Sequence, residues 1–215
     1  MEFSIIHKLF DTAIEALLWI LFFYVAIWNW MNGLMSTFGL CADKPYVNDI
    51  IQAYMFSVMV ALIDSMLNLP FSIYSTFVIE EKYGFNKMTP GIFIGDQIKK
   101  FIIILVIYAA IIPLILWIIA ISGPTLVLNL AAISVGLIII VSLLVPTVFV
   151  PLFFTYSELE NEELKTAIWL EAEKTDVNVS EIKVIDGSKR SSHSNAFVSG
   201  FWHFRKVVLF DTLIA

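Results

Sequence analysis

Charged residues are scarce in this sequence. Only 15% of its 215 residues are Asp, Glu, Lys or Arg, and 59% are hydrophobic, whereas about a quarter of a typical soluble domain is charged. Residues 101–157 contain no charged side chain and no histidine. One membrane crossing needs only ~20 apolar residues, so this run excludes a water-soluble globular protein. The scarcity of charge and the net charge of −6 also exclude a disordered chain and a nucleic-acid-binding protein.

Cysteine and histidine are also scarce. The single cysteine, Cys41, excludes an intramolecular disulfide and a cysteine-based zinc site. The three histidines are His7, His193 and His203, and none has the spacing of an HExxH zinc-peptidase helix. No third ligand is spaced to join His193 and His203. The sequence therefore predicts no metal site and no catalytic residue within these 215 positions.

Four apolar segments account for the hydrophobic residues, and each is long enough to cross a bilayer. They cover residues 14–31, 50–69, 101–122 and 126–144. Gly123-Pro124 divides the uncharged run with a turn signal. The predicted fold class is therefore mainly α, a multi-span α-helical membrane protein whose membrane region covers residues 1–153.

Basic residues set the predicted orientation. Four spans place the N-terminus, the loop 70–100 and the C-terminal tail on one side, which carries Lys8, Lys82, Lys87, Lys99, Lys100 and Lys165. The opposite side has only Lys44. The positive-inside rule then places the N-terminus, the loop and the tail in the cytoplasm. Asn178-Val179-Ser180 is a glycosylation sequon, and its glycosylation in a secretory membrane would contradict this topology.

Asp64 is the one acid within the predicted span 50–69. Ionisable residues in spans usually face a bundle interior or a water-filled path, which suggests a site in an intramembrane chamber. The alternative is an acid near the interface that pairs with a lysine of the loop. A channel or carrier built around Asp64 is the corresponding functional hypothesis, which the soluble motifs described below disfavour.

The loop 70–100 predicts an amphipathic helix at the cytoplasmic surface. Pro70 is expected to open this helix, because a missing N–H costs nothing in a first turn. Gly84 is expected to end it in a left-handed cap. Glu80 and Glu81 are interpreted as a solvated helix face.

The tail, residues 154–215, predicts a partial cytoplasmic α+β domain. Ser157 is expected to cap a helix over residues 158–174, whose apolar stripe consists of Leu159, Leu164, Ile168 and Ala172. The alternating segment 181–185, the segment 195–201 and the segment 206–210, which has a continuous apolar core, predict about three strands. One helix cannot cover both faces of such a sheet, so the domain is expected to be incomplete.

Two motifs resemble one known family. Residues 69–74 (LPFSIY) and 77–86 (FVIEEKYGFN) are similar to the loop motif of the CAAX prenyl protease 1 family. Residues 186–197 (DGSKRSSHSNAF) and 207–213 (VVLFDTL) resemble its second motif. The resemblance covers nearly the whole chain, and it implies that residues 154–215 are an incomplete peptidase domain.

The resemblance also implies a function. Members of this family are multi-span zinc metalloendopeptidases of the endoplasmic reticulum membrane or the inner nuclear membrane, and they process the C-terminal CAAX tails of prenylated proteins. In them, HExxH and a later glutamate hold zinc, downstream of the segment that resembles residues 210–213. The expectation is that this chain is the N-terminal portion of such an enzyme, that it lacks the family's first and last spans, and that alone it binds no zinc and is inactive.

The same resemblance supplies the candidate site residues. Asn195, Ala196 and Phe197 match an edge strand that offers backbone hydrogen bonds to an extended substrate by strand addition, and His193 and Ser194 flank it. The alternative for these residues is ordinary sheet and turn formation. At the level of the whole protein, the alternative is a non-catalytic membrane scaffold or binding protein derived from the family. Besides the prenylated substrate, the lipid bilayer is the only other expected partner, and no oligomeric state is predicted.

Overall fold

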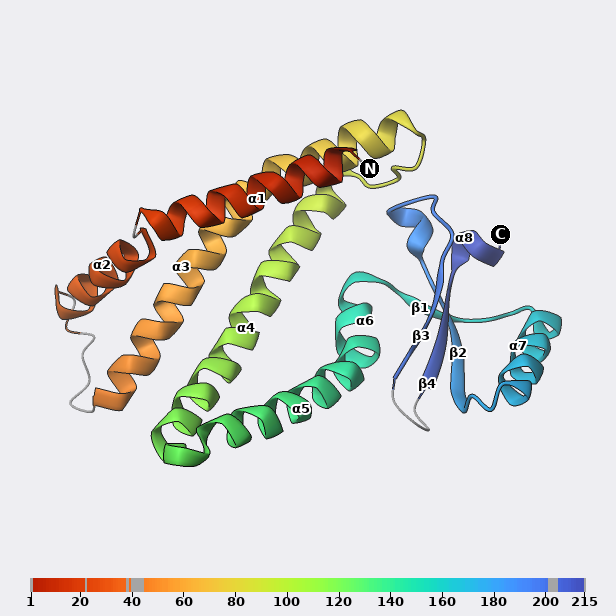
Figure 1. Ribbon diagram of the computed structural model, residues 1–215. Coiled ribbons are helices and arrows are strands. Elements are labelled where there is room, and N and C mark those ends of the chain that lie inside the picture. Colours follow the sequence, from red (N-terminus) through yellow and green to blue (C-terminus); the bar gives the residue numbers. More distant parts are fainter. Residues whose placement is uncertain (1, 22, 38, 40–44, 201–204, 215) are drawn as a thin grey trace. The chain divides into compact units, whose positions relative to one another are not determined.

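The computed structural model describes residues 2–21, 23–37, 39, 45–200 and 205–214 (Figure 1). Cys41, Lys44 and His203, which the sequence singles out, lie outside these residues. The chain forms two compact units. The first contains Met1–Tyr74 and Ile102–Gly123, and the second contains Ser75–Phe101 and Pro124–Ala215. All candidate site residues belong to the second unit.

The first unit is helical. It contains α1 (Glu2–Ile20), α2 (Phe23–Thr37), α3 (Pro45–Tyr74) and the later part of α4 (Pro90–Ser122). The expected span 14–31 is divided between α1 and α2 and is not one continuous helix. An aromatic cluster joins α1 to the end of α3, where Phe3 lies 5.3 Å from Tyr74 and Phe10 lies 4.7 Å from Phe71 between ring centres.

The helix expected to begin at Pro70 does not exist as a separate element. Helix α3 continues through Pro70 to Tyr74 and passes directly into a π-helical turn, Ser75–Glu80. A proline inside a helix removes one backbone hydrogen bond and crowds the carbonyl four residues earlier. Neighbouring helical turns on both sides tolerate that loss here, so Pro70 lies inside the helix and does not begin one.

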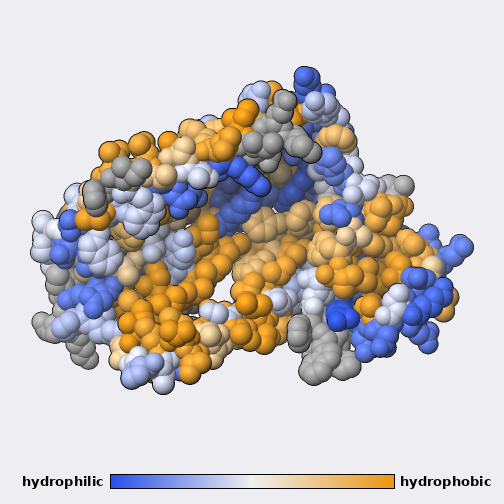
Figure 2. All heavy atoms as spheres, viewed as in Figure 1, coloured by the Kyte–Doolittle hydropathy of each residue, from blue (hydrophilic) through white to orange (hydrophobic). Residues whose placement is uncertain are grey.

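The uncharged run forms α4 and α5 (Leu126–Leu144), which are separated by a 3₁₀ turn, Gly123–Thr125. Gly123 has a φ of +47°, a left-handed conformation that glycine adopts without steric cost, as the turn signal predicts. A second π-helical turn, Val145–Phe149, and the short α6 (Val150–Phe153) follow. Hydrophobic side chains cover α4 and α5 in Figure 2.

Two helical stretches among the described residues are long and apolar enough to cross a membrane. They are Pro45–Glu80 and Pro90–Phe153, and the bent pair α1–α2 counts as a third if it forms one span. The second stretch has 64 residues, about three times the length that one crossing requires. Two crossings joined at Gly123 fit this length, and the count of four spans stays a prediction.

The tail forms a four-stranded sheet of order β1-β2-β4-β3. Its strands are β1 (Tyr156–Glu158), β2 (Val179–Ile185), β3 (Ala196–Ser199) and β4 (Arg205–Phe210), with helices α7 (Glu162–Lys174) and α8 (Asp211–Ile214). Strands β2 and β4 are parallel, and the two outer strands are antiparallel to their neighbours. The fold class is the predicted one: helical membrane segments with a small α+β domain.

The predicted start of α7 is wrong. Ser157 lies in β1, and the helix begins four residues later, after Asn161, whose side chain accepts a hydrogen bond from the Leu164 amide at 2.9 Å. Asparagine is as good an N-cap as serine. Strand β1 pairs with β2 from Tyr156 to Glu158. Because these residues are extended and paired, they cannot form the first turn of α7.

A compact core lies between α7 and one face of the sheet. Leu159, Ile182, Val184 and Leu209 are buried in it, and Leu164 and Ile168 of the predicted apolar stripe pack against them. On the opposite face Ile185 and Val208 are also fully buried. The expectation that one face would stay uncovered therefore does not hold at these two positions. Hydrophilic residues cover the outer side of α7 (Figure 2).

Candidate functional site

The two motifs that carry the family resemblance lie against each other. Asn86 and Ser191 form an antiparallel bridge. The Lys87 amide donates to the Arg190 carbonyl at 3.1 Å, and the Ser192 amide donates to the Phe85 carbonyl at 2.9 Å. Two segments about a hundred residues apart in sequence are thereby held together by their backbones.

Gly84 shapes the first of these segments as predicted. Its φ is +74°, and its amide donates to the Glu81 carbonyl at 3.0 Å while the Phe85 amide donates to the Glu80 carbonyl at 2.9 Å. This pair of bonds is a Schellman cap. The cap ends the helical stretch and directs Phe85 toward the second motif, where its ring stacks on the His193 ring with 4.0 Å between centres.

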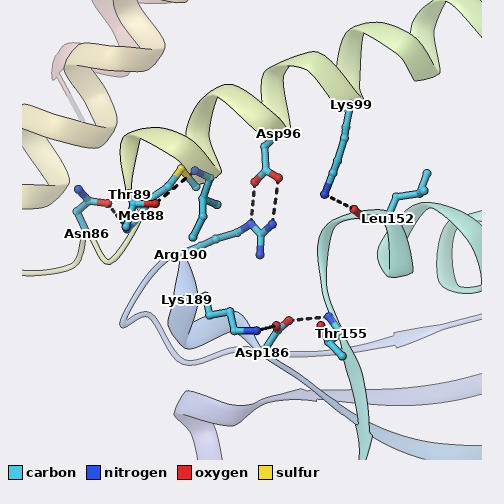
Figure 3. Close-up of polar contacts among 11 residues, drawn as sticks. Asn86, Met88, Thr89, Asp96, Lys99, Leu152, Thr155, Asp186, Lys189 and Arg190 are labelled. Atoms are coloured by element: carbon cyan, nitrogen blue, oxygen red, sulfur yellow. Dashed lines mark hydrogen bonds and ion pairs between the residues drawn. The ribbon is translucent and has the colours of Figure 1, made fainter.

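A buried ion pair joins α4 to the same place (Figure 3). Arg190 Nε lies 2.8 Å from Asp96 Oδ2, and Arg190 Nη2 lies 3.0 Å from Asp96 Oδ1. The side chains are only 15% and 10% exposed. The Arg190 guanidinium also lies 4.6 Å from the centre of the Phe154 ring. Such bidentate pairs fix the orientation of both groups.

Sequence reasoning missed both members of this pair. Asp96 is the only acid between Glu81 and Glu158, an isolated charge next to an apolar span, which was a signal that it needs a partner. Nothing in the sequence identifies Arg190 as that partner, because the two residues are separated by 94 positions.

Asp186 forms a second polar junction (Figure 3). Its carboxylate accepts the Thr155 amide at 2.7 Å and the Lys189 ammonium at 2.6 Å. Burial alone would raise the pKa of the Asp186 carboxyl, but the bonds from Lys189 and Thr155 outweigh it, and the pKa is lowered. On α4, Lys99 Nζ donates to the Leu152 carbonyl at 2.8 Å.

Gly187 leaves room for the Phe210 ring. A Cβ at this position would lie 2.5 Å from Cδ2 of Phe210, so any other residue would force the ring to move. The Phe210 ring contacts Phe154 and Phe197, with centres 6.2 Å and 6.4 Å away. Next to Gly187, the Ser188 amide donates to Asp211 Oδ1 at 2.8 Å. This contact connects the 3₁₀ turn, Gly187–Lys189, to the end of β4.

The predicted site residues lie in and before β3. His193, Ser194, Asn195 and Ala196 are exposed, and Phe197 is half-buried. The approach to the strand is fixed against α8, because Thr212 Oγ1 donates to the His193 carbonyl at 3.0 Å and Ser194 Oγ donates to the Thr212 carbonyl at 2.7 Å. The His193 carbonyl and the Ser194 hydroxyl thus fix the approach to β3 through bonds to Thr212.

Strand β3 is an edge strand. In the described part of the chain it pairs with β4 only, in the register Ala196↔Leu209 to Ser199↔Lys206. The Phe210 amide donates to the Asn195 carbonyl at 3.0 Å. Because hydrogen-bonded and non-bonded pairs alternate in antiparallel sheets, the backbone groups of Ala196 and Val198 point to the free edge. The Asn195 side chain accepts the Ala196 amide at 2.8 Å.

Asp64 lies at a different place, in the first unit. It lines a cavity of about 210 Å³ together with Asp11 and Glu15 of α1, Tyr24 of α2 and other residues of α1 and α3. Its Oδ1 accepts a hydrogen bond from Asn68 at 2.9 Å. The neighbour of Asp64 is therefore an amide rather than the loop lysine that the interface interpretation expected.

The donor set for a metal ion is not present in the described part of the chain. Within it, no group of three or more His, Cys, Asp or Glu side chains is placed to hold a metal. His7 and His193 lie in different units, and His7 contacts Asn68 and Asp11 at 2.8 Å and 3.4 Å. These residues do not fit a zinc site of the family's kind.

The chain is similar over its whole length to known proteins. The family described as CAAX prenyl protease N-terminal, five membrane helices, matches residues 1–155, and Peptidase family M48 matches residues 158–215. The CAAX prenyl protease 1 homolog of Mus musculus is 39% identical over 87% of this chain and 39% of its own length. CAAX prenyl protease 1 of Saccharomyces cerevisiae is 33% identical over 99% of this chain and 47% of its own length.

A solved structure has the same fold. The crystal structure of S. mikatae Ste24p superposes with a TM-score of 0.86 at 31% identity, covering 99% of this chain and 49% of that chain. The chain spans about half the length, or less, of the curated relatives that it matches.

Proposed function

Because this chain belongs to the CAAX prenyl protease family of M48 peptidases, we propose that it forms the membrane wall and the substrate-binding strand of a protease that processes prenylated CAAX tails. The chain is a multi-pass membrane protein. We infer the endoplasmic reticulum membrane or the inner nuclear membrane as its location, with the N-terminus and the tail in the cytoplasm. The positive-inside bias of its lysines supports this orientation.

The free edge of β3 is the observation that carries the proposal. An extended peptide can add to an exposed strand edge and gain main-chain hydrogen bonds, while side-chain pockets add specificity. Ala196 and Val198 present their backbone groups to that edge, and Val198 is 58% exposed. The Asn195 amide oxygen holds the Ala196 N–H at the position that a substrate carbonyl would take.

Zinc is the cofactor of the complete enzyme in this proposal. When bound, it would activate water for attack on the peptide bond. Because the described residues do not form a zinc site, the role of this chain is to bind and align the substrate. His193, Ser194, Asn195, Ala196 and Phe197 are the proposed substrate-binding residues, with His193 and Ser194 fixing the approach to the strand.

A proline substitution tests the strand-addition step. Val198→Pro removes an N–H that faces the free edge and leaves the β4 ladder in place, a position where edge strands tolerate proline. Val198→Ala keeps that N–H and is the matched control. We expect a fluorescent farnesylated peptide with a CAAX tail to bind the purified chain in lipid nanodiscs, and Val198→Pro alone to lose this binding. Equal binding by both variants would refute strand addition, and no binding to the unsubstituted chain would favour a non-catalytic scaffold.

A further inference from the structure

The cluster around Arg190 has a role that the edge strand alone does not explain. We propose that Asp96 and Arg190 are positioning residues: their buried ion pair latches the segment 190–195, which leads into β3, onto the first turns of α4. This inference rests on the proposed function, because its consequence is a β3 held in place for a membrane-anchored peptide. Figure 3 shows the two side chains reaching toward each other, from the helix and from the turn before the strand.

Burial and geometry make this pair a strong constraint. Both carboxylate oxygens of Asp96 accept from Arg190, at 2.8 Å and 3.0 Å, and Phe154 packs against the guanidinium. The Asp96 residue is only 7% exposed. Loss of either partner would leave the other charge buried without compensation. Lysine cannot replace the fork of the guanidinium, because it is a point charge on a flexible stem.

The ion pair and the backbone bonds both hold the short segment 190–192. Residues 190–192 are bonded through the Arg190 carbonyl to the Lys87 amide and through the Ser192 amide to the Phe85 carbonyl. The next residue, His193, stacks on Phe85. The other end of the segment is fixed separately, where the Phe210 amide donates to the Asn195 carbonyl. The ion pair thus reinforces the Arg190 end of the segment, which the backbone bonds alone would hold less firmly.

This arrangement connects the membrane helix to substrate binding. A prenylated peptide is anchored by its lipid, so pairing of its main chain with β3 depends on how firmly the segment before the strand is held on the first turns of α4. Asp96 lies within the first two turns of α4, and Arg190 lies six residues before the start of β3. The latch therefore links the first turns of α4 directly to the segment that leads into the edge strand.

Two variants and one control test the latch. Arg190→Lys and Asp96→Asn keep the size of each side chain but remove the bidentate pair, and Lys100→Ala changes an exposed charge one turn after Asp96 on α4. Residue-level hydrogen exchange of the Lys87 and Ser192 amides reports the latch without any ligand. We expect both latch variants to exchange faster at these amides and to bind the farnesylated peptide roughly tenfold or more weakly, and Lys100→Ala to match the unsubstituted chain.

The outcomes separate the two claims. Unchanged exchange at Lys87 and Ser192 in both variants would overturn the latch. Faster exchange with unchanged peptide affinity would make the pair purely structural and overturn its positioning role. If the unsubstituted chain bound no peptide while both variants exchanged faster, the latch would stand and the proposed function would fail.

Discussion

The Asp186 carboxylate accepts the Thr155 amide 2.7 Å away, and this bond ties the turn after β2 to the residue that precedes β1. Asp186 thus connects the end of the membrane segment to the motif that leads into the proposed substrate strand. The same carboxylate holds Lys189.

Replacement of Asp186 by alanine should destabilise the tail. The variant leaves the Thr155 N–H without its acceptor and Lys189 without its partner, and a lost bond to a charged group costs about 1.5–3 kcal/mol. Asp186→Asn keeps an acceptor for Thr155 and should lose less. Thermal unfolding followed by tryptophan fluorescence, which includes Trp169 of α7, measures the difference. Equal melting of both variants and the unsubstituted chain would contradict this role.

The contribution of Asp186 should depend on pH in one direction. Its folded-state pKa is lowered below the ordinary value of about 3.9, so its stabilisation is complete above that value and is lost as the pH falls through the folded pKa. The difference in melting temperature between the unsubstituted chain and Asp186→Asn should therefore be constant from neutral pH down to about 5 and shrink below about 4. A difference in melting temperature that increased on acidification would contradict the lowered pKa of Asp186.

Gly187→Ala should cost stability through the Phe210 ring. The new methyl group would lie 2.5 Å from Cδ2, and overpacking of this kind costs about 1–3 kcal/mol. Gly91→Ala is the matched control, because nothing lies within 4 Å of its added Cβ and alanine favours the helix. The midpoint of a chemical denaturation curve, measured for each variant, tests this expectation. Similar midpoints for the two variants would show that Phe210 moves without cost.

Gly84→Ala should loosen the loop that meets the second motif. The space around Gly84 is open, so the cost comes from the left-handed backbone and amounts to roughly 1–2 kcal/mol. Asparagine tolerates this conformation better than alanine, so Gly84→Asn should be milder. Hydrogen exchange at the Phe85 amide measures the effect. If both variants exchanged like the unsubstituted chain, the cap would not be needed to direct Phe85.

The purified 215-residue chain should bind no stoichiometric zinc and should not cleave a prenylated peptide. The described residues supply no set of three metal ligands. Metal analysis after dialysis against zinc, together with mass spectrometry of a farnesylated CAAX peptide, tests both statements. One zinc per chain, or a released tripeptide, would contradict them.

Local signals predicted the elements that depend on local chemistry. The alternation at 181–185 and the continuous apolar core at 206–210 correspond to β2 and β4. Gly84 and Gly123 lie at turns where the backbone is left-handed. Strand β1 was missed because three residues, Tyr156–Glu158, carry no alternating pattern of their own and become a strand only by pairing with β2. The prediction that Pro70 begins a helix was wrong, because the cost of a proline inside a helix depends on the helical turns around it.

The candidate site was predictable in one part only. The family resemblance placed residues 195–197 at an edge strand with His193 and Ser194 beside it, and β3 lies at the edge of the described sheet. The alternation that points Ala196 and Val198 outward required the register with β4. The Asp96–Arg190 pair required the tertiary fold, since no pattern connects an acid at the start of an apolar helix to an arginine 94 residues later.

Residue-level hydrogen exchange across β3, with and without a farnesylated CAAX peptide, tests the central claim most directly. Strand addition predicts that the peptide slows exchange of the Val198 amide, which faces the free edge, and leaves the Phe197 amide unchanged, because Phe197 belongs to a hydrogen-bonded pair with β4. Binding of the peptide without slower exchange at Val198 would contradict the proposal that β3 is the strand to which the substrate adds.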